Sequence, residues 1–221
     1  MKVLEVKDVS KSFYSTHALT RVNFDLEKGE VLALAGENGA GKSTMMNILL
    51  GSFAPDEGTM LLNGKTYEPK NPSDALQKGI SMIHQELCLV PSMTVADNVW
   101  IGRCNQFSRC GIYMPQLCEE RTQKLFDDYG IDLNPKESVK NLSTAQMQMV
   151  EIARAISYGS QIVIMDEPTS ALSDKEVKVL YKIIRRLTQE GVSVLFISHK
   201  LEEVFDLADR VTIFRDGHMV G

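Results

Sequence analysis

A glycine-rich run in the first fifth of the chain has the residue types and spacing of a phosphate-binding loop. The run fits the pattern GxxxxGKS, and its residues are Gly36, Glu37, Asn38, Gly39, Ala40, Gly41, Lys42 and Ser43, with Thr44 next. Glycines let the backbone turn its N–H groups toward phosphates, and Lys42 can reach the β and γ oxygens. The Ser43 hydroxyl suits a Mg²⁺ ligand. We therefore predict a nucleotide site here, in preference to an ordinary glycine-rich turn.

Two consecutive acids follow an apolar run in the last third of the chain. Residues 162–165 are apolar, and Asp166 and Glu167 come directly after them. Open α/β sheets bind ligands at the carboxyl ends of their strands, so Asp166 suits the Mg²⁺ site. Glu167 can orient or deprotonate the water that attacks the γ-phosphorus. An acid at a strand end is more often a solvated cap, but pairing with the phosphate loop favours catalysis.

Strand and helix patterns around these residues predict an α/β fold. Strands are predicted before the loop at residues 2–9, 19–26 and 31–35, and a hairpin turn after it at Asn63-Gly64. The last third alternates between strands at 162–165, 192–197 and 210–214 and helices at 175–190 and 201–208. This alternation is typical of a parallel sheet that is covered on both faces. The pattern from 87 to 159 predicts an inserted helical subdomain.

Composition excludes several classes of protein. The formal net charge of -5 gives no general attraction to nucleic acid, and no basic stripe with aromatic residues is present. The longest apolar runs are too short to span a membrane, and no leader pattern follows Met1, so a cytoplasmic location is expected. The four cysteines, Cys88, Cys104, Cys110 and Cys118, lack zinc-type CxxC pairs. Free thiols are expected rather than disulfides.

The order of further motifs resembles that of ABC ATPases. Residues 142–146, Leu-Ser-Thr-Ala-Gln, are similar to the signature motif of that family, usually LSGGQ, and Gln85 and His199 occur in the family's order. The resemblance covers essentially the whole chain. It implies a P-loop NTPase fold with a RecA-like core and an antiparallel β subdomain, over residues 1–86 and 160–221. The helical subdomain would then be residues 87–159.

The resemblance also implies roles for individual residues. Gln85 matches the glutamine that contacts Mg²⁺ and senses the γ-phosphate, and His199 matches the histidine that contacts the γ-phosphate beside the catalytic Glu167. Phe13 matches the aromatic residue that stacks on adenine. The implied metal ligands are Ser43, Gln85 and Asp166. Ser143 and Gln146 of the signature would bind the nucleotide held by a partner domain.

Several stretches look like the ATP-binding subunits of ribose and galactoside importers. These are residues 36–42, 84–87, 147–153 and 167–172. In those proteins two such domains are fused, and this chain with its one phosphate loop resembles the first half. The resemblance implies ATP and Mg²⁺ as cofactors, and a second nucleotide-binding domain, a transmembrane permease and, indirectly, a sugar-binding protein as partners. The expected location is peripheral, on the inner face of the cell membrane.

Two alternatives to a sugar-import ATPase remain open, and departures from the family pattern favour one of them. Thr144 and Ala145 replace two glycines of the signature and add bulk where the partner's γ-phosphate should meet backbone. One alternative is a nucleotide-gated module with weak hydrolysis, and the other is a non-transport ABC ATPase that moves ribosomes or DNA. Ser143 with Gln146 also forms a capping-box pattern. Ser173, where the family often has aspartate, is predicted to cap a helix together with Glu176.

Overall fold

The computed structural model describes residues 1–109 and 111–221, which form two compact units. The first unit consists of Met1–Met82, Ser160–Glu167 and Leu187–Gly221. The second unit consists of Ile83–Gly159 and Pro168–Arg186. Each unit is therefore built from more than one segment of the chain.

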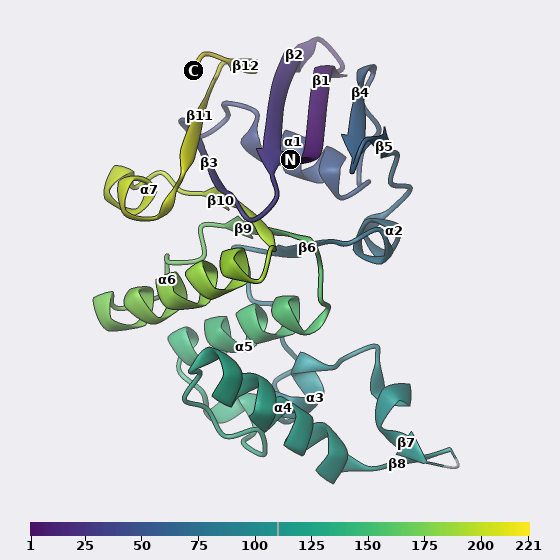
Figure 1. Cartoon of the computed structure of the whole chain (residues 1–221), viewed down its shortest axis with the longest axis vertical. Coiled ribbons are helices and arrows are strands. Elements are labelled where there is room, and N and C mark those ends of the chain that lie inside the picture. The colour runs from purple at the N-terminus through teal and green to yellow at the C-terminus, as the bar shows by residue number, and fades with distance from the viewer. Residues whose placement is uncertain (110) are drawn as a thin grey trace. The chain divides into compact units, whose positions relative to one another are not determined.

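A six-stranded sheet forms one layer of the first unit (Figure 1). In spatial order its strands are β12 (His218–Met219), β11 (Arg210–Arg215), β3 (Val31–Ala35), β10 (Ser193–Ile197), β9 (Ile162–Asp166) and β6 (Ile80–Ile83). The four strands from β11 to β9 are parallel neighbours, which confirms the predicted parallel sheet. β3 and β10 are buried along their whole length, as expected for strands with both faces covered.

A four-stranded antiparallel sheet forms the other layer of this unit. Its order is β2 (Thr16–Glu27), β1 (Lys2–Phe13), β4 (Glu57–Leu62) and β5 (Lys65–Thr66). The predicted hairpin is present, because Leu62 pairs with Lys65 around Asn63 and Gly64, which both have positive φ. β1 continues four residues past the predicted end at Val9, through Ser10 and Lys11, where the apolar pattern has stopped.

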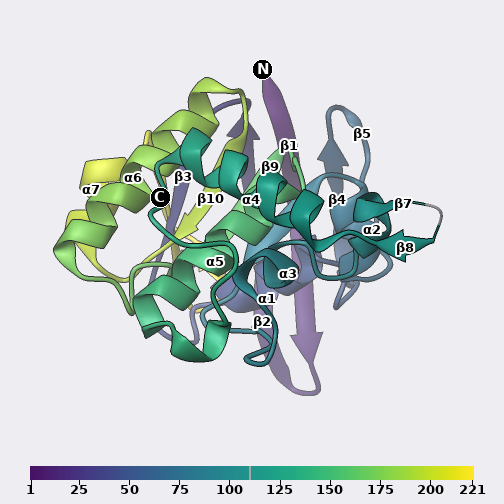
Figure 2. The same cartoon turned by 90° about the horizontal axis from the view of Figure 1, so that it is seen from below.

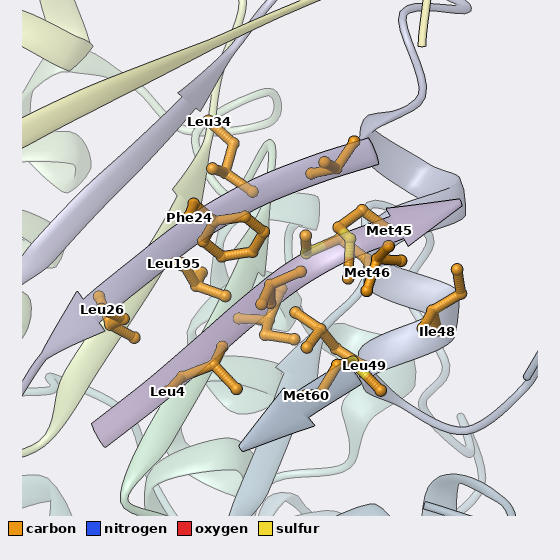
Figure 3. Packing of buried hydrophobic residues seen from close by; sticks show 14 of the residues in the cluster. Leu4, Phe24, Leu26, Leu34, Met45, Met46, Ile48, Leu49, Met60 and Leu195 are labelled. Atoms are coloured by element: carbon orange, nitrogen blue, oxygen red, sulfur yellow. The ribbon is translucent and has the colours of Figure 1, made fainter. Parts of the chain in front are cut away.

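Apolar side chains from both sheets and from helix α1 (Lys42–Leu49) form one core (Figure 3). Ten labelled members, all buried, are Leu4, Phe24, Leu26, Leu34, Met45, Met46, Ile48, Leu49, Met60 and Leu195. Fully burying a side chain of this size contributes about 1.5–3 kcal/mol. This packing holds α1 firmly in the first unit, and with it the loop that precedes the helix.

The second unit is mainly helical. Its helices include α3 (Val95–Val99), α4 (Pro115–Tyr129) and α5 (Thr144–Ser157), with 3₁₀ turns at Cys104–Phe107 and Val139–Asn141. α3 contacts both α4 and α5 (Figures 1 and 2). The short hairpin of β7 (Ser108–Arg109) and β8 (Ile112–Tyr113) was not predicted, because two-residue strands leave no periodic pattern.

Three further helices are α2 (Pro72–Gln77), α6 (Asp174–Gln189) and α7 (Leu201–Leu207). α6 and α7 confirm the helices predicted at 175–190 and 201–208. Leu180, Ile184 and Leu187 on α6 are buried at helical spacing. None of the helices in the described part of the chain is long and apolar enough to cross a membrane.

The described cysteines agree with the prediction of free thiols. Cys88, Cys104 and Cys118 are unbonded, and Cys110 lies outside the described residues. Cys118 is buried, and burial raises the pKa of its thiol. This thiol is therefore expected to be unreactive in the folded protein.

A buried hydrogen bond in the second unit makes its packing testable. The Trp100 indole N–H donates to Thr122 Oγ1 at 2.9 Å, and both side chains are buried. Thr122→Val keeps the shape but leaves the indole N–H unsatisfied, so the free energy of unfolding should fall by about 1–3 kcal/mol. Urea unfolding followed by tryptophan fluorescence measures this loss. The exposed Thr66→Val serves as control, and equal midpoints for the two variants would contradict the prediction.

Candidate active site

The predicted phosphate loop connects β3 to α1 in the first unit. Gly36, Gly39 and Gly41 have φ values of 148°, 82° and 107°, which residues with a side chain rarely adopt. A Cβ on Gly36 would lie 2.3 Å from the Phe214 carbonyl oxygen, whereas a Cβ on Gly39 would meet no described atom within 4 Å. The loop therefore needs glycine at position 36 for a close backbone approach and at position 39 for its dihedral angle.

The start of α1 is suited to binding an anion. Gly41 is the N-cap and has no side chain that could accept bonds from the first N–H groups of the helix, where Ser43 and Thr44 lie. These groups form the positive end of the helix dipole. Lys42 is buried, and its Nζ donates to the carbonyl oxygens of Gly36 at 2.6 Å and Glu37 at 2.9 Å. The lysine ammonium is thus held against the loop.

A cleft of about 590 Å³ opens beside the loop. It is lined by two segments, whose residues are Gly36, Glu37, Asn38, Gly39, Ala40, Ile213, Phe214, Arg215 and Asp216. The Gly217 N–H donates to the Ala40 carbonyl oxygen at 3.1 Å, which ties the second segment to the loop. This second segment was not predicted as part of the site. The parallel pairing of β11 with β3 brings it there.

Asp166 lies at the same sheet edge as the loop. In register, Ile197 of β10 pairs with Asp166 on one side and with Leu34 of β3 on the other. The backbones of Asp166 and Leu34 are therefore about two strand spacings apart, roughly 10 Å. Because the three strands are parallel, the loop after β3 and the acid at the end of β9 share one edge, as the sequence predicted.

Glu167 and His199 form a hydrogen-bonded pair. His199 Nδ1 lies 2.7 Å from Glu167 Oε1. The Glu167 backbone has a φ of 46°, in the left-handed region that few residues other than glycine adopt, and its N–H donates to the Ile197 carbonyl oxygen at 3.0 Å. Such a backbone costs about 1–3 kcal/mol and is typical of functional sites. The structure thus brings together the two residues predicted to be catalytic.

Phe13 ends β1 with its ring half-buried beside a second aromatic residue. The Phe13 and Phe53 ring centroids are 5.2 Å apart at an interplanar angle of 73°. Lys11 Nζ lies 5.6 Å from the Phe13 centroid and pairs with Asp56 at 2.6 Å. Phe53 was not predicted, since forty residues separate it from Phe13 and no motif contains it.

The remaining predicted residues lie in the second unit. Gln85 follows β6, and Ser143 is the N-cap of α5. The predicted capping box is confirmed, since Ser143 Oγ accepts from the Gln146 N–H at 3.2 Å and Gln146 Oε1 accepts from the Ser143 N–H at 2.9 Å. The substituted Thr144 and Ala145 are the first two residues of this helix.

The predicted pair at the start of α6 is also present. The N–H and the hydroxyl of Ser173 both donate to Glu176 Oε2, at 2.8 and 2.7 Å. These bonds to Ser173 hold the pKa of Glu176 below its ordinary value. The carboxylate is therefore ionised at neutral pH, and it fixes Ser173 at the start of α6.

The segment after Gln85 is fixed to α5 within the second unit. The Cys88 N–H donates to Glu151 Oε1 at 2.9 Å, and Arg154 Nη1 donates to the Cys88 carbonyl oxygen at 3.0 Å. Arg154 and Glu151 also form an ion pair. The backbone N–H and carbonyl oxygen of Cys88 are thus both hydrogen-bonded to side chains of α5.

Two glycine substitutions test the geometry of the loop. In Gly36→Ala the new Cβ would collide with backbone of β11, so the free energy of unfolding should fall by about 3–5 kcal/mol. Gly39→Ala adds only the cost of a left-handed backbone, about 1–2 kcal/mol. Urea unfolding of both variants measures the difference. Equal losses in the two variants would contradict the close approach at Gly36.

Comparison with known proteins gives matches along the chain. The family model described as "ABC transporter" matches residues 19–170. The galactose/methyl galactoside import ATP-binding protein MglA of Clostridium perfringens (strain ATCC 13124) is 46% identical over 99% of this chain. A Burkholderia cenocepacia (strain HI2424) protein named for ribose, galactose and methyl galactoside import and ATP binding is 49% identical over 99% of this chain. This chain spans 42% of the length of each relative.

Solved structures share the fold. A nucleotide-free ATP-binding cassette from an ABC transporter superposes with a TM-score of 0.88 at 25% identity, over 100% of this chain and 90% of that one. The dimeric cassette MJ0796 gives a TM-score of 0.83 at 24% identity, over 99% of this chain and 97% of that one. The similarity therefore extends over both units of the chain.

Proposed function

Because this chain belongs to the ABC transporter family and has the P-loop NTPase fold of its ATP-binding cassettes, we propose that it binds and hydrolyses ATP to power sugar import. In this proposal it is the first of two ATP-binding domains in a fused subunit. The main support for the proposal is that the glycine loop and the hydrogen-bonded pair of Glu167 and His199 lie at the same edge of one sheet. Phosphoryl transfer needs both parts, a phosphate cradle and a group that handles the attacking water.

Binding of the adenine and of the phosphates is assigned to residues of the first unit. Phe13 offers a ring face to the adenine, and the phosphates are assigned to the N–H groups of the loop, Gly36, Glu37, Asn38, Gly39, Ala40, Gly41, Lys42, Ser43 and Thr44. The Lys42 ammonium, now bonded to two carbonyl oxygens, can exchange these for phosphoryl oxygens at about the same place.

The proposed Mg²⁺ ligands are Ser43, Asp166 and Gln85. Their hydroxyl, carboxylate and amide oxygens are the hard donors that Mg²⁺ prefers. No cluster of three or more His, Cys, Asp or Glu side chains suited to a metal occurs among residues 1–109 and 111–221. The proposed set of one carboxylate, one hydroxyl and one amide fits Mg²⁺, which uses one or two carboxylates together with substrate phosphates. When bound, the ion neutralises charge on the phosphoryl oxygens.

The chemical step is assigned to Glu167 and His199. The Glu167 carboxylate orients the attacking water or accepts its proton. His199 bonds to this carboxylate through Nδ1, so Nε2 is the nitrogen left to face the substrate. With both nitrogens protonated, the imidazole can donate to Glu167 and to a γ-phosphoryl oxygen at once.

A second ATP-binding domain completes the proposed site. Its signature residues would cover the γ-phosphate here, while Ser143 and Gln146 of this chain would act at the partner's nucleotide. The N-terminus of α5 supports that role, since helix N-termini bind anions. The dimeric cassette of the same fold also supports a dimer mate. When the two domains close around ATP, the helical subdomain, residues 87–159, would move about the joint at Gln85. It would transmit this movement to a transmembrane permease from the inner face of the membrane.

Sugar uptake tests the transport part of the proposal. Vesicles that contain the full-length subunit and its permease should take up labelled galactose or ribose when ATP is present on the subunit's side. A Glu167→Gln substitution in the first domain should reduce this uptake. Unchanged uptake of both sugars in the variant would contradict the proposal. Thr144 and Ala145 favour an alternative, a nucleotide-gated module with weak hydrolysis. The rate of phosphate release, measured with and without the second domain, distinguishes this alternative from the proposed ATPase.

A further inference from the structure

A buried carboxylate on α7 holds the loop that carries His199. Glu203, in the first turn of α7, is buried. Its Oε2 accepts from the Ser198 hydroxyl at 2.9 Å, and its Oε1 accepts from Lys200 Nζ at 2.9 Å. The Lys200 N–H donates in turn to Ser198 Oγ at 3.1 Å. Both chain neighbours of His199 are therefore bound to one carboxylate.

We propose that Glu203 is a positioning residue for ATP hydrolysis, which holds His199 within hydrogen-bond reach of Glu167. The inference rests on the proposed function and assigns a role to residues outside every motif in the sequence. The loop between β10 and α7 consists of residues 198–200. With its first and last residues bound to Glu203, the backbone of the middle residue has little freedom.

The exposure of His199 explains why this restraint matters. Its side chain is 60% exposed, so packing by neighbouring side chains restrains the imidazole only weakly. The position of the ring therefore depends on its hydrogen bond to Glu167 and on the backbone of its loop. Ser198 is 2% exposed and Glu203 is buried, so the hydrogen bond between them is shielded from water. The buried hydrogen bond between Ser198 and Glu203 therefore restrains the loop of a histidine whose own side chain is weakly packed.

The contacts differ from those of an ordinary helix cap. Glu203 is the third residue of α7, and in a capping box such a residue accepts from the N–H of the N-cap, which is Lys200 here. That N–H instead donates to Ser198 Oγ, which donates in turn to Glu203. The hydrogen bonds thus link Glu203 to Ser198 and Ser198 to the Lys200 N–H, so they join the residues on both sides of His199 in the chain.

Substitutions at adjacent acids on α7 test this role. Glu203→Ala should lower kcat for ATP hydrolysis about 10-fold or more, with KM for ATP changed less than about 3-fold. Glu203 acts through the loop of His199, so its loss alters the geometry of the catalytic pair rather than the binding of ATP. Glu203→Gln still offers an oxygen to Ser198 and should retain most of the activity. Glu202→Gln, at the exposed neighbouring position, is the control and should leave kcat unchanged. A KM effect without a kcat effect would overturn the proposal.

A double-mutant comparison separates positioning from general destabilisation. In a His199→Ala background, Glu203→Ala should cause little further loss of kcat, since both substitutions remove the same contact. Losses that multiply would overturn the proposal.

The imidazole ¹⁵N signals of His199 give a readout that needs no turnover. They should change in Glu203→Ala and not in Glu202→Gln. Unchanged signals in Glu203→Ala would overturn the inference, whereas absence of ATP hydrolysis in the wild-type protein with its second domain would overturn the proposed function instead.

Discussion

Glu167→Gln should lower kcat for ATP hydrolysis by about 10²–10⁴-fold, the range that a positioned general base contributes. The amide has nearly the same shape as the carboxylate but cannot take a proton from water. Its oxygen can still accept from His199 Nδ1, so the pair's 2.7 Å contact should survive. ATP affinity should change by less than about 3-fold, because the substitution acts mainly on the transition state.

The control for this prediction is Glu202→Gln, which makes the same chemical change at an exposed site on α7. Phosphate release measures kcat, and equilibrium dialysis with labelled ATP measures affinity. Equal turnover in the Glu167 variant and in the wild-type protein would remove Glu167 from the role proposed. A parallel loss of ATP binding would indicate a damaged loop rather than a lost base.

Lys42→Ala should weaken ATP binding by about 100-fold, equivalent to about 2.7 kcal/mol. The ammonium is buried and lies within 3 Å of two loop carbonyl oxygens, so it is already at the loop when phosphate arrives. Charge-assisted bonds to phosphate are about twice as strong as neutral ones. Alanine removes them and leaves no substitute donor at that position.

Displacement of a fluorescent ATP analogue measures the affinity of this variant. Lys65→Ala, at an exposed position on β5, is the matched control and should bind ATP like the wild-type protein. Urea unfolding of the Lys42 variant shows whether the fold is kept. An unchanged dissociation constant would contradict the assignment of Lys42 to the phosphates.

The phosphate loop and the sheet around it could be predicted because their signals are local. Gly36 to Ser43 are consecutive, and the buried strands β3, β9 and β10 are short apolar runs between turn residues. The capping box at Ser143 is likewise contained in four residues. Each of these features is determined by neighbours in the chain, so sequence patterns are sufficient to find it.

Some of the features that escaped prediction depend on contacts between distant segments. Phe53 meets Phe13, and Gly217 binds Ala40, only because the strands and helices fold together. β6 was missed because four residues beside a helix give too little periodicity. The hydrogen bond between Glu203 and Ser198 spans only five residues, but it runs through a serine hydroxyl that no motif includes.

The central claim is a hydrolytic site completed by a second ATP-binding domain. The most direct test is the rate of Mg²⁺-dependent phosphate release at several concentrations of this chain, alone and with the second domain, with Glu167→Gln as control. We expect turnover per chain to rise with concentration and with the added domain, and to vanish in the control. Turnover that stays constant on dilution would contradict the shared site, and ATP binding without turnover in any mixture would favour the nucleotide-gated module.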